Sequence, residues 1–211
     1  MRVVIYGSRP DGHARVVLET FVSDGGFEIV GLLDDEPANI DRKISSTTVV
    51  GSRADLGRLA GEGVEGVLLG FGGAQGREAV ATAIHGAGLA LPILVHASAY
   101  VSSSATLAAG TQVLPHATVG PGTRIGRAVL LNTGVIVEHD AAIGDFSVID
   151  PGAVIAGRAS IGASVEIGAR AVVLPDISVG NCAFVGAGAV VTRSVPAGET
   201  VAGVPARQLH R

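Results

Sequence analysis

One short segment of the sequence carries groups suited to acid–base chemistry. His139 lies between Glu138 and Asp140 in the segment VEHDAAIGDFSV, residues 137–148. An imidazole titrates near neutral pH, so it can take a proton from an attacking amine or hydroxyl and hand it to a leaving group. A carboxylate on the far ring nitrogen would fix the imidazole in the tautomer that accepts this proton. Both flanking acids are candidates for that role.

The chain around His139 repeats with a period of six residues. Every sixth residue from Val95 to Val191 is Val, Ile or Leu, which makes seventeen consecutive positions. An α-helix cannot keep such a stripe on one face, because its period of about 3.6 residues rotates the stripe around the axis. A coil of short strands can, with one strand and one corner in each hexapeptide. The aliphatic residues should point into the coil, and His139, two residues after Val137, should lie on a corner and point outward.

Before this repeat, the pattern changes to alternating strand and helix signals. Strands are predicted over residues 2–8, 27–35 and 66–73, and helices over residues 12–24, 53–63 and 74–88. Strands that alternate with helices form a parallel sheet. We therefore expect two domains: a Rossmann-like α/β domain over residues 1–92, and an all-β coil over residues 93–211 that ends in an extended tail after Val191.

The first loop of the α/β domain follows a strand and opens a helix. Backbone N–H groups and the helix dipole attract phosphate at such a place. The loop, YGSRPDGHARVV (residues 6–17), is not G-x-G-x-x-G, so the dinucleotide fingerprint is absent. Asp34 and Asp35 end the second strand, where an α/β unit presents acids to a ribose or base. A helix cap and an ordinary turn would explain the same residues, because Gly and Asp favour turns.

The order of these parts resembles a known family. A Rossmann-like part, a hexapeptide coil and a tail containing GVPAR (residues 203–207) are similar to the sugar-nucleotide acetyltransferases of bacterial glycan synthesis. These include amino-sugar N-acetyltransferases and sialic acid O-acetyltransferases, and the resemblance covers essentially the whole chain. It implies a left-handed parallel β-helix in which three hexapeptides complete each triangular turn, a homotrimer, and acetyl-CoA as co-substrate.

The first loop carries part of this resemblance. The family loop reads G-A-S/G-G-H-A/G-K/R-V, and residues 12–16 match its second half. The resemblance implies that Gly12 and His13, together with Asp34 and Asp35, bind the nucleotide sugar. The first half of the loop differs, because SRPD (residues 8–11) makes it two residues longer than the family pattern. No contact is carried over to those four residues.

The resemblance also assigns roles around His139. It makes His139 the general base and favours Asp140 over Glu138, because the family motif has an acid directly after its catalytic histidine. Gly157 lies three hexapeptides after His139, one turn further along the coil. Its bare N–H could stabilise the oxyanion of a tetrahedral intermediate, and the family places its donor there. Some members have a second histidine nine residues after the first, where this chain has Val148.

The end of the chain resembles the segment that holds coenzyme A in this family. Arg193 and Arg207 lie in GAGAVVTRSVPAGETVAGVPARQL, residues 186–209. They are the expected partners of the cofactor phosphates, because arginine suits bidentate phosphate contacts. Gly157 would face the thioester of the same cofactor. Ordinary surface arginines are the alternative reading.

Composition excludes several other classes. A net charge of −4 and 3% aromatic residues argue against nucleic-acid binding, and no apolar run is long enough to span a membrane. The single cysteine, Cys182, and the lack of a signal-peptide pattern predict a cytoplasmic protein. We expect no metal site, because the chain lacks the two histidines five residues apart found in metal-binding hexapeptide proteins. The remaining histidines and Cys182 are expected to have no catalytic role.

These observations predict an acetyl-CoA-dependent N-acetyltransferase that acts on a nucleotide-linked amino sugar. The amine would attack directly, without a metal or a covalent intermediate. Two alternatives remain at this stage: O-acetylation of a sugar or sialic acid by the same machinery, and a non-catalytic trimer that binds sugar nucleotides or serves as a scaffold. The sequence does not identify the nucleotide, the sugar or the exact acyl group.

Overall fold

A computed structural model of the chain describes residues 1–9, 12–21 and 26–209. The chain forms two compact units. The first contains Met1–Gly72 and Glu78–Pro92, and the second contains Gly73–Arg77 and the chain from Ile93 onward. Within the described residues, no helix is both long and apolar enough to cross a membrane.

The first unit is built around a five-stranded sheet with the order β3-β4-β2-β1-β5. Strands β4, β2, β1 and β5 are parallel, as the alternation of strands and helices predicts, and β3 is antiparallel to β4. The sequence pattern did not predict the β3–β4 hairpin, because β3 has only two residues and carries no alternating pattern. The strands are β1 (Arg2–Tyr6), β2 (Glu28–Leu33), β3 (Lys43–Ile44), β4 (Thr47–Gly51) and β5 (Gly66–Leu69). The helices are α1 (His13–Phe21), α2 (Leu56–Gly61), α3 (Arg77–Gly86) and the 3-10 turns η1 (Pro37–Asn39) and η2 (Arg53–Asp55).

The central strands of this sheet are buried on both faces. Val3, Val4 and Ile5 of β1 are fully buried, which explains why the strand reads as a continuous apolar run. Helix α1 packs closely beside them, because Gly70 has no side chain: a Cβ there would lie 2.6 Å from Ile5 Cγ2 and 3.0 Å from Ala14 Cβ. This packing fixes the first turn of α1 at the end of β1.

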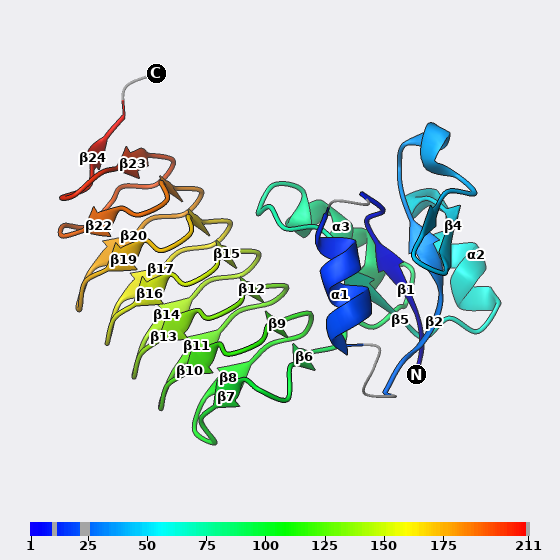
Figure 1. The fold of residues 1–211 in the computed structure, drawn as a ribbon, viewed down its shortest axis with the longest axis horizontal. Helices are drawn as coiled ribbons and strands as arrows, with labels where there is room; N and C mark the ends of the chain where they lie inside the picture. The colour runs from blue at the N-terminus through cyan, green and yellow to red at the C-terminus, as the bar shows by residue number, and fades with distance from the viewer. Residues whose placement is uncertain (10–11, 22–25, 210–211) are drawn as a thin grey trace. The chain divides into compact units, whose positions relative to one another are not determined.

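The second unit is a coil of two- and three-residue strands, which Figure 1 shows as a stack from β6 (green) to β24 (red); all of them pair in parallel except β24. Each strand from β6 to β22 pairs with the one three hexapeptides away, as in Ile136↔Val154, so the coil has three flat faces. The first face consists of β7 (Tyr100–Val101), β10 (Thr118–Val119), β13 (Ile136–Val137), β16 (Val154–Ile155), β19 (Val172–Val173) and β22 (Val190–Val191). The second consists of β8 (Thr106–Leu107), β11 (Arg124–Ile125), β14 (Ala142–Ile143), β17 (Ser160–Ile161) and β20 (Ser178–Val179). The third consists of β6 (Leu94–Val95), β9 (Gln112–Val113), β12 (Leu130–Leu131), β15 (Val148–Ile149), β18 (Glu166–Ile167), β21 (Phe184–Val185), β23 (Thr200–Ala202) and β24 (Arg207–Gln208).

The repeated aliphatic residues fill the coil. From Val113 to Val191 every one of them is at most 3% exposed, as the six-residue period predicts. The prediction is wrong for Val95, which is 43% exposed, and Val101 and Leu107 are only partly buried. These three belong to the first coil, which has no preceding coil of its own unit to pack against.

From Gly110 to Gly188, every sixth residue has a left-handed backbone conformation, which makes the corners. Most of the residues in it are not glycines; Asp140, Phe146, Arg158 and Asp176 have φ between 58° and 63°. The glycines that directly follow the aliphatic residues serve a different purpose, namely close approach of successive coils. A Cβ at Gly144, for example, would lie 2.6 Å from the backbone nitrogen of Ala163.

The end of the chain does not form the simple extended tail that its Gly and Pro content predicts. Strand β23 pairs in parallel with β21 and so continues the third face of the coil. Strand β24 then turns back antiparallel to β23. The backbone N–H and C=O groups of this segment have partners in the sheet, which holds Arg207 at its edge.

Candidate active site

His139 lies on the corner that follows β13. Its side chain is 49% exposed, as expected for a residue that points out of the coil. The backbone of this corner is fixed by its neighbours: Asp140 N donates to Pro121 O at 2.8 Å, and Arg158 N donates to His139 O at 3.0 Å. The imidazole is therefore accessible while its attachment point is rigid.

Asp140 is the acid that contacts the imidazole. Oδ2 of Asp140 lies 2.9 Å from Nδ1 of His139. The left-handed φ of 58° at Asp140 turns the chain at this point, so two successive side chains converge instead of diverging as they would on a strand. Glu138 is exposed, and within the described part of the chain it makes no hydrogen bond to His139. Because Nδ1 faces a carboxylate, Nε2 is the ring nitrogen left to act as a base.

Gly157 lies against the opposite edge of the ring. A Cβ at this position would be 2.6 Å from Nε2 of His139 and 2.9 Å from Cε1, so no other residue fits without moving the imidazole. The spacing of three hexapeptides thus brings the two together, as the sequence predicts.

The backbone N–H of Gly157 has no acceptor among the described residues. At equivalent corners this N–H is capped by the side chain one coil further on. Arg127 N donates to Asp145 Oδ1 at 2.8 Å, and Ala163 N donates to Asn181 Oδ1 at 2.9 Å. The residue one coil after Gly157 is Pro175, whose side chain cannot accept a hydrogen bond. Gly157 is buried, and among the described residues its N–H differs from these two in having no side-chain cap.

In the first unit, the two predicted acids lie beside the first loop. Ser8 Oγ donates to Asp34 Oδ2, and Tyr6 OH donates to Asp35 Oδ2 at 2.5 Å. Burial, and then the hydrogen bond to Asp35, raise the pKa of Tyr6. Sequence reasoning missed Ser8 and Tyr6, because their hydrogen bonds join residues more than 25 positions apart. The ends of β1 and β2 thus form one polar edge, as the parallel sheet predicts.

The glycine and histidine of the first loop are placed at the start of α1. Gly12 N donates to Arg9 O at 2.9 Å, and His13, half-buried, is the first residue of the helix. Gly7 has a φ of 121°, and a Cβ there would lie 2.7 Å from Gly70 O, so only glycine fits. The first half of the loop is longer than in the family pattern, and two of its residues, Pro10 and Asp11, lie outside the described residues.

Both units of the chain resemble known proteins. The family model described as the PglD N-terminal domain matches residues 2–84, and the bacterial transferase hexapeptide model matches residues 158–193. A mutant GDP-perosamine N-acetyltransferase from Caulobacter crescentus, in complex with CoA and GDP-perosamine, is 30% identical with a TM-score of 0.93, over 100% of this chain and 98% of that one. The acetyltransferase domain of PglB from Neisseria gonorrhoeae, in complex with acetyl coenzyme A, is 32% identical with a TM-score of 0.90, over 99% and 98%.

The chain is a sugar-nucleotide acetyltransferase of the hexapeptide-repeat family. A third similar structure, WeeI from Acinetobacter baumannii, is 26% identical with a TM-score of 0.80, over 99% of this chain and 100% of that one. The coil of the second unit is accordingly the left-handed parallel β-helix of this family.

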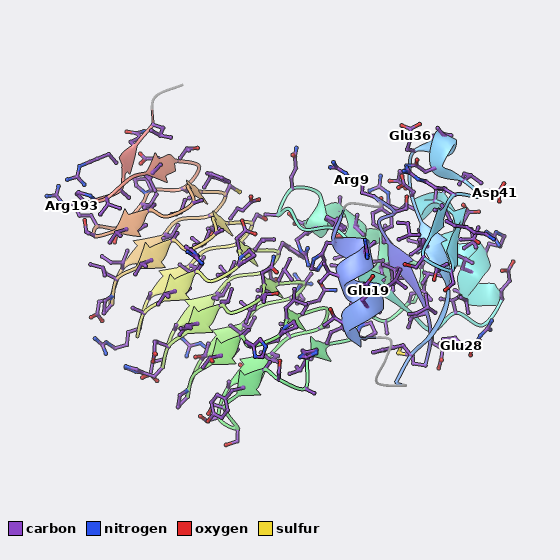
Figure 2. The ribbon with its side chains drawn as sticks, viewed as in Figure 1. Arg9, Glu19, Glu28, Glu36, Asp41 and Arg193 are labelled. Atoms are coloured by element: carbon purple, nitrogen blue, oxygen red, sulfur yellow. The ribbon has the colours of Figure 1, made fainter. Side chains whose placement is uncertain are left out.

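Two arginines of the acetyltransferase lie together at the far end of this β-helix. Arg193 and Arg207 line one cavity of about 140 Å³, together with Glu199 and Gln208. Arg193, labelled in Figure 2, lies in the same corner column as His139 and Gly157, three coils beyond His139. At about 4.8 Å per coil this is roughly 14 Å. The structure thus brings the two predicted phosphate partners together in one cavity, and Arg193 is in line with His139 but separate from it.

The position of the second family histidine offers no polar group. Val148 is on β15 and is fully buried. Its side chain has no hydrogen-bonding group that could replace the family's histidine. Within the described residues, no group of three or more His, Cys, Asp or Glu side chains is arranged to hold a metal ion.

Proposed function

We propose that this acetyltransferase transfers the acetyl group of acetyl-CoA to a primary amine on a nucleotide-linked sugar. The observation that carries the proposal is the position of the His139 imidazole. Asp140 contacts Nδ1 at one edge of the ring, and Gly157 packs against Nε2 at the other edge. This arrangement occurs in a chain that is 30% identical to a GDP-perosamine N-acetyltransferase whose mutant forms a complex with CoA and GDP-perosamine.

In the proposed reaction, the neutral amine attacks the thioester carbonyl while Nε2 of His139 takes one of its protons. The carbonyl oxygen becomes an oxyanion, and the N–H of Gly157 donates to it. Removal of such a donor typically raises the activation free energy by about 2.7 to 4 kcal/mol. When the tetrahedral intermediate collapses, the C–S bond breaks and the imidazolium returns its proton to the thiolate of CoA. Because protonated amine and protonated imidazole are both inactive, turnover should fall below neutral pH.

The first unit is the proposed site of the nucleotide. Gly12 and His13 offer the start of α1 to the phosphates, and Asp34 and Asp35 offer carboxylates to the ribose or base. The GDP-perosamine bound by the Caulobacter relative makes a 4-amino sugar the first substrate class to test. Arg193 and Arg207 would hold the phosphates of coenzyme A, because they line one cavity and Arg193 lies in the same column as the reacting groups.

We also propose a homotrimer, because the first face of the β-helix is apolar. Its outward residues on β13, β16, β19 and β22 are Ile136, Val154, Val172 and Val190. The second face carries Ala142, Ser160 and Ser178 at the matching positions. Ile136 is exposed and the three valines are partly exposed, and such an apolar stripe favours burial against another chain. Since β13 leads directly into the corner of His139, a neighbouring protomer on this face would line the groove beside the imidazole.

Acetyl transfer should be tested with acetyl-CoA and nucleotide-linked 4-amino sugars carrying GDP, UDP, dTDP or CMP. A thermal-shift screen of the same compounds selects the nucleotide, because a ligand that binds the folded state raises its stability. Mass spectrometry should show a gain of one acetyl group that survives alkaline treatment, as an amide does and an ester does not. His139→Ala should abolish it. A wild-type protein that acetylates none of these compounds, or a His139→Ala variant as fast as the wild type, would overturn the proposal.

With a single cysteine, the chain is suited to the reducing cytoplasm, where we propose that the reaction takes place.

A further inference from the structure

A column of charged side chains runs along the corner that carries His139. Asp140, Arg158 and Asp176 are spaced by three hexapeptides and lie one above another in successive coils. Their φ angles are 58°, 61° and 61°, so their side chains leave the backbone in the same direction. Successive coils are about 4.8 Å apart, like paired strands. The guanidinium of Arg158 therefore has one carboxylate within reach on each side.

Arg158 pairs with only one of the two acids. Its Nε donates to Oδ1 of Asp176 and its Nη2 donates to Oδ2, both at 2.7 Å. This bidentate arrangement is the strongest contact that an arginine makes with a carboxylate. The hydrogen bonds from Arg158 hold the pKa of Asp176 below its usual range. Asp140 contacts His139 instead, through Oδ2 and Nδ1 at 2.9 Å.

The other neighbour of Asp140 in the column makes room for it. Gly122 lies one coil before Asp140, and a Cβ there would be 2.5 Å from Oδ1 of Asp140. The carboxylate of Asp140 thus lies between a residue without a side chain and an arginine that is already engaged. Neither Gly122 nor Arg158 competes with His139 for the carboxylate of Asp140.

We propose that Asp176 is a positioning residue for the acetyl transfer, which keeps Arg158 away from Asp140 and so leaves Asp140 free to orient His139. This inference rests on the proposed function of His139 as the base. Without the charge of Asp176, the remaining acid in the column is Asp140. A bidentate contact from Arg158 would then compete with the single bond to Nδ1, and the imidazole would lose its fixed tautomer.

Three variants test the proposal by kinetics. Asp176→Asn should lower kcat by about 10- to 100-fold, because misplaced catalytic groups cost that much, and leave both KM values within about twofold. Arg158→Gln should keep nearly wild-type activity. The double variant Asp176→Asn/Arg158→Gln should recover most of the lost kcat, because the competing cation is gone. The pair is exposed and contributes little to stability, so all three variants should fold.

Asp145→Asn is the matched control. It breaks another arginine–aspartate pair across one coil, in which Nε of Arg127 lies 2.9 Å from Oδ2 of Asp145, on a corner without His139. Its kcat should equal that of the wild type. Full activity of Asp176→Asn, or a double variant no faster than Asp176→Asn, would overturn the positioning role.

A second measurement separates this inference from the function itself. A long-range ¹H–¹⁵N spectrum of the imidazoles above their titration range, assigned with His139→Gln, reports which ring nitrogen of His139 carries the proton. The wild type and the double variant should show the Nδ1–H form, and Asp176→Asn a mixture. If the wild type transfers no acetyl group, the proposed function fails, while this spectrum still decides the role of Asp176. An unchanged spectrum in Asp176→Asn counts against it.

Discussion

The imidazole of His139 packs against Gly157, which lies one coil further along the chain. A Cβ at 157 would come within 2.6 Å of Nε2, which is the nitrogen that faces away from Asp140. The proposed base thus lies beside Gly157, whose backbone N–H has no acceptor among the described residues. In the proposed reaction, both groups would contact the same carbonyl.

Gly157→Ala should therefore inactivate the enzyme without unfolding it. Gly157 does not have a positive φ, so alanine fits the backbone, but its methyl group would push the ring from its place. We expect kcat to fall at least about 100-fold, since both the base and the oxyanion donor are disturbed. Circular dichroism should show an intact coil. The control is Gly57→Ala in α2, where a Cβ meets no atom within 4 Å. Wild-type kcat in Gly157→Ala would contradict the arrangement.

The two acids beside His139 should respond differently to loss of charge. Asp140→Asn keeps the left-handed backbone, which asparagine tolerates, but it offers Nδ1 an amide and no longer fixes the tautomer. We expect a fall in kcat of about 100-fold or more, with the KM for acetyl-CoA unchanged. Glu138→Gln is the matched control and should stay near wild-type activity, because Glu138 makes no contact with the ring among the described residues. If steady-state kinetics show the reverse order, Glu138 is the orienting acid.

Most of the β-helix follows from the sequence, because its core depends on a local repeat. The aliphatic residue of each hexapeptide predicts its own burial, and the turn of three hexapeptides implied by the family resemblance then predicts that His139 and Gly157 meet. Contacts between side chains on separate coils do not follow in this way. Arg158 and Asp176 have the same spacing as His139 and Gly157, yet nothing in the sequence shows which of two acids the arginine selects. A spacing of three hexapeptides between an arginine and an aspartate is nevertheless the pattern by which such pairs could be found in a sequence.

Other features depend on contacts far apart in the chain. Arg77 lies in the Gly-rich segment GGAQGR, residues 72–77, yet it is fully buried in the second unit, where its Nε donates to Ala128 O at 2.8 Å. Arginine is an exposed residue type in most proteins, so the local sequence does not predict this burial; the hydrogen bond to a carbonyl 51 residues further along the chain helps to explain it. The bond between Ser8 and Asp34 was missed for the same reason.

Asp150 should make the stability of the β-helix depend on pH. Burial, and then the charge of Glu166, raise its pKa to about 6 in the folded protein, from an ordinary value of 3.8. The folded state therefore binds more protons than the unfolded state between about pH 4 and pH 6, and stability is lost as the pH rises through that range. Asp150→Asn should remove this loss. Because Asp150 is only partly buried, we expect a gain of about 1 kcal/mol at pH 7.5, or about 2 to 4 °C in Tm.

The measurement is thermal unfolding of wild type and Asp150→Asn at pH 5 and pH 7.5. The difference in Tm should shrink at pH 5, where Asp150 is mostly protonated in the folded wild type. A gain of equal size at both pH values would show that the substitution acts through packing, and not through ionisation of Asp150.

The apolar first face of the β-helix should control assembly and, through it, activity. Val172→Glu places a carboxylate at the centre of the stripe formed with Val154 and Val190. Burying an unpaired charge between protomers is costly, so the variant should be a monomer by size-exclusion chromatography with light scattering. Acetyl transfer should fall with it, because a groove beside His139 would lose its second wall. Ser160→Glu, which adds the same charge on the second face, should stay trimeric and active. A Val172→Glu variant that remains trimeric and active would show that the protomers meet on another face.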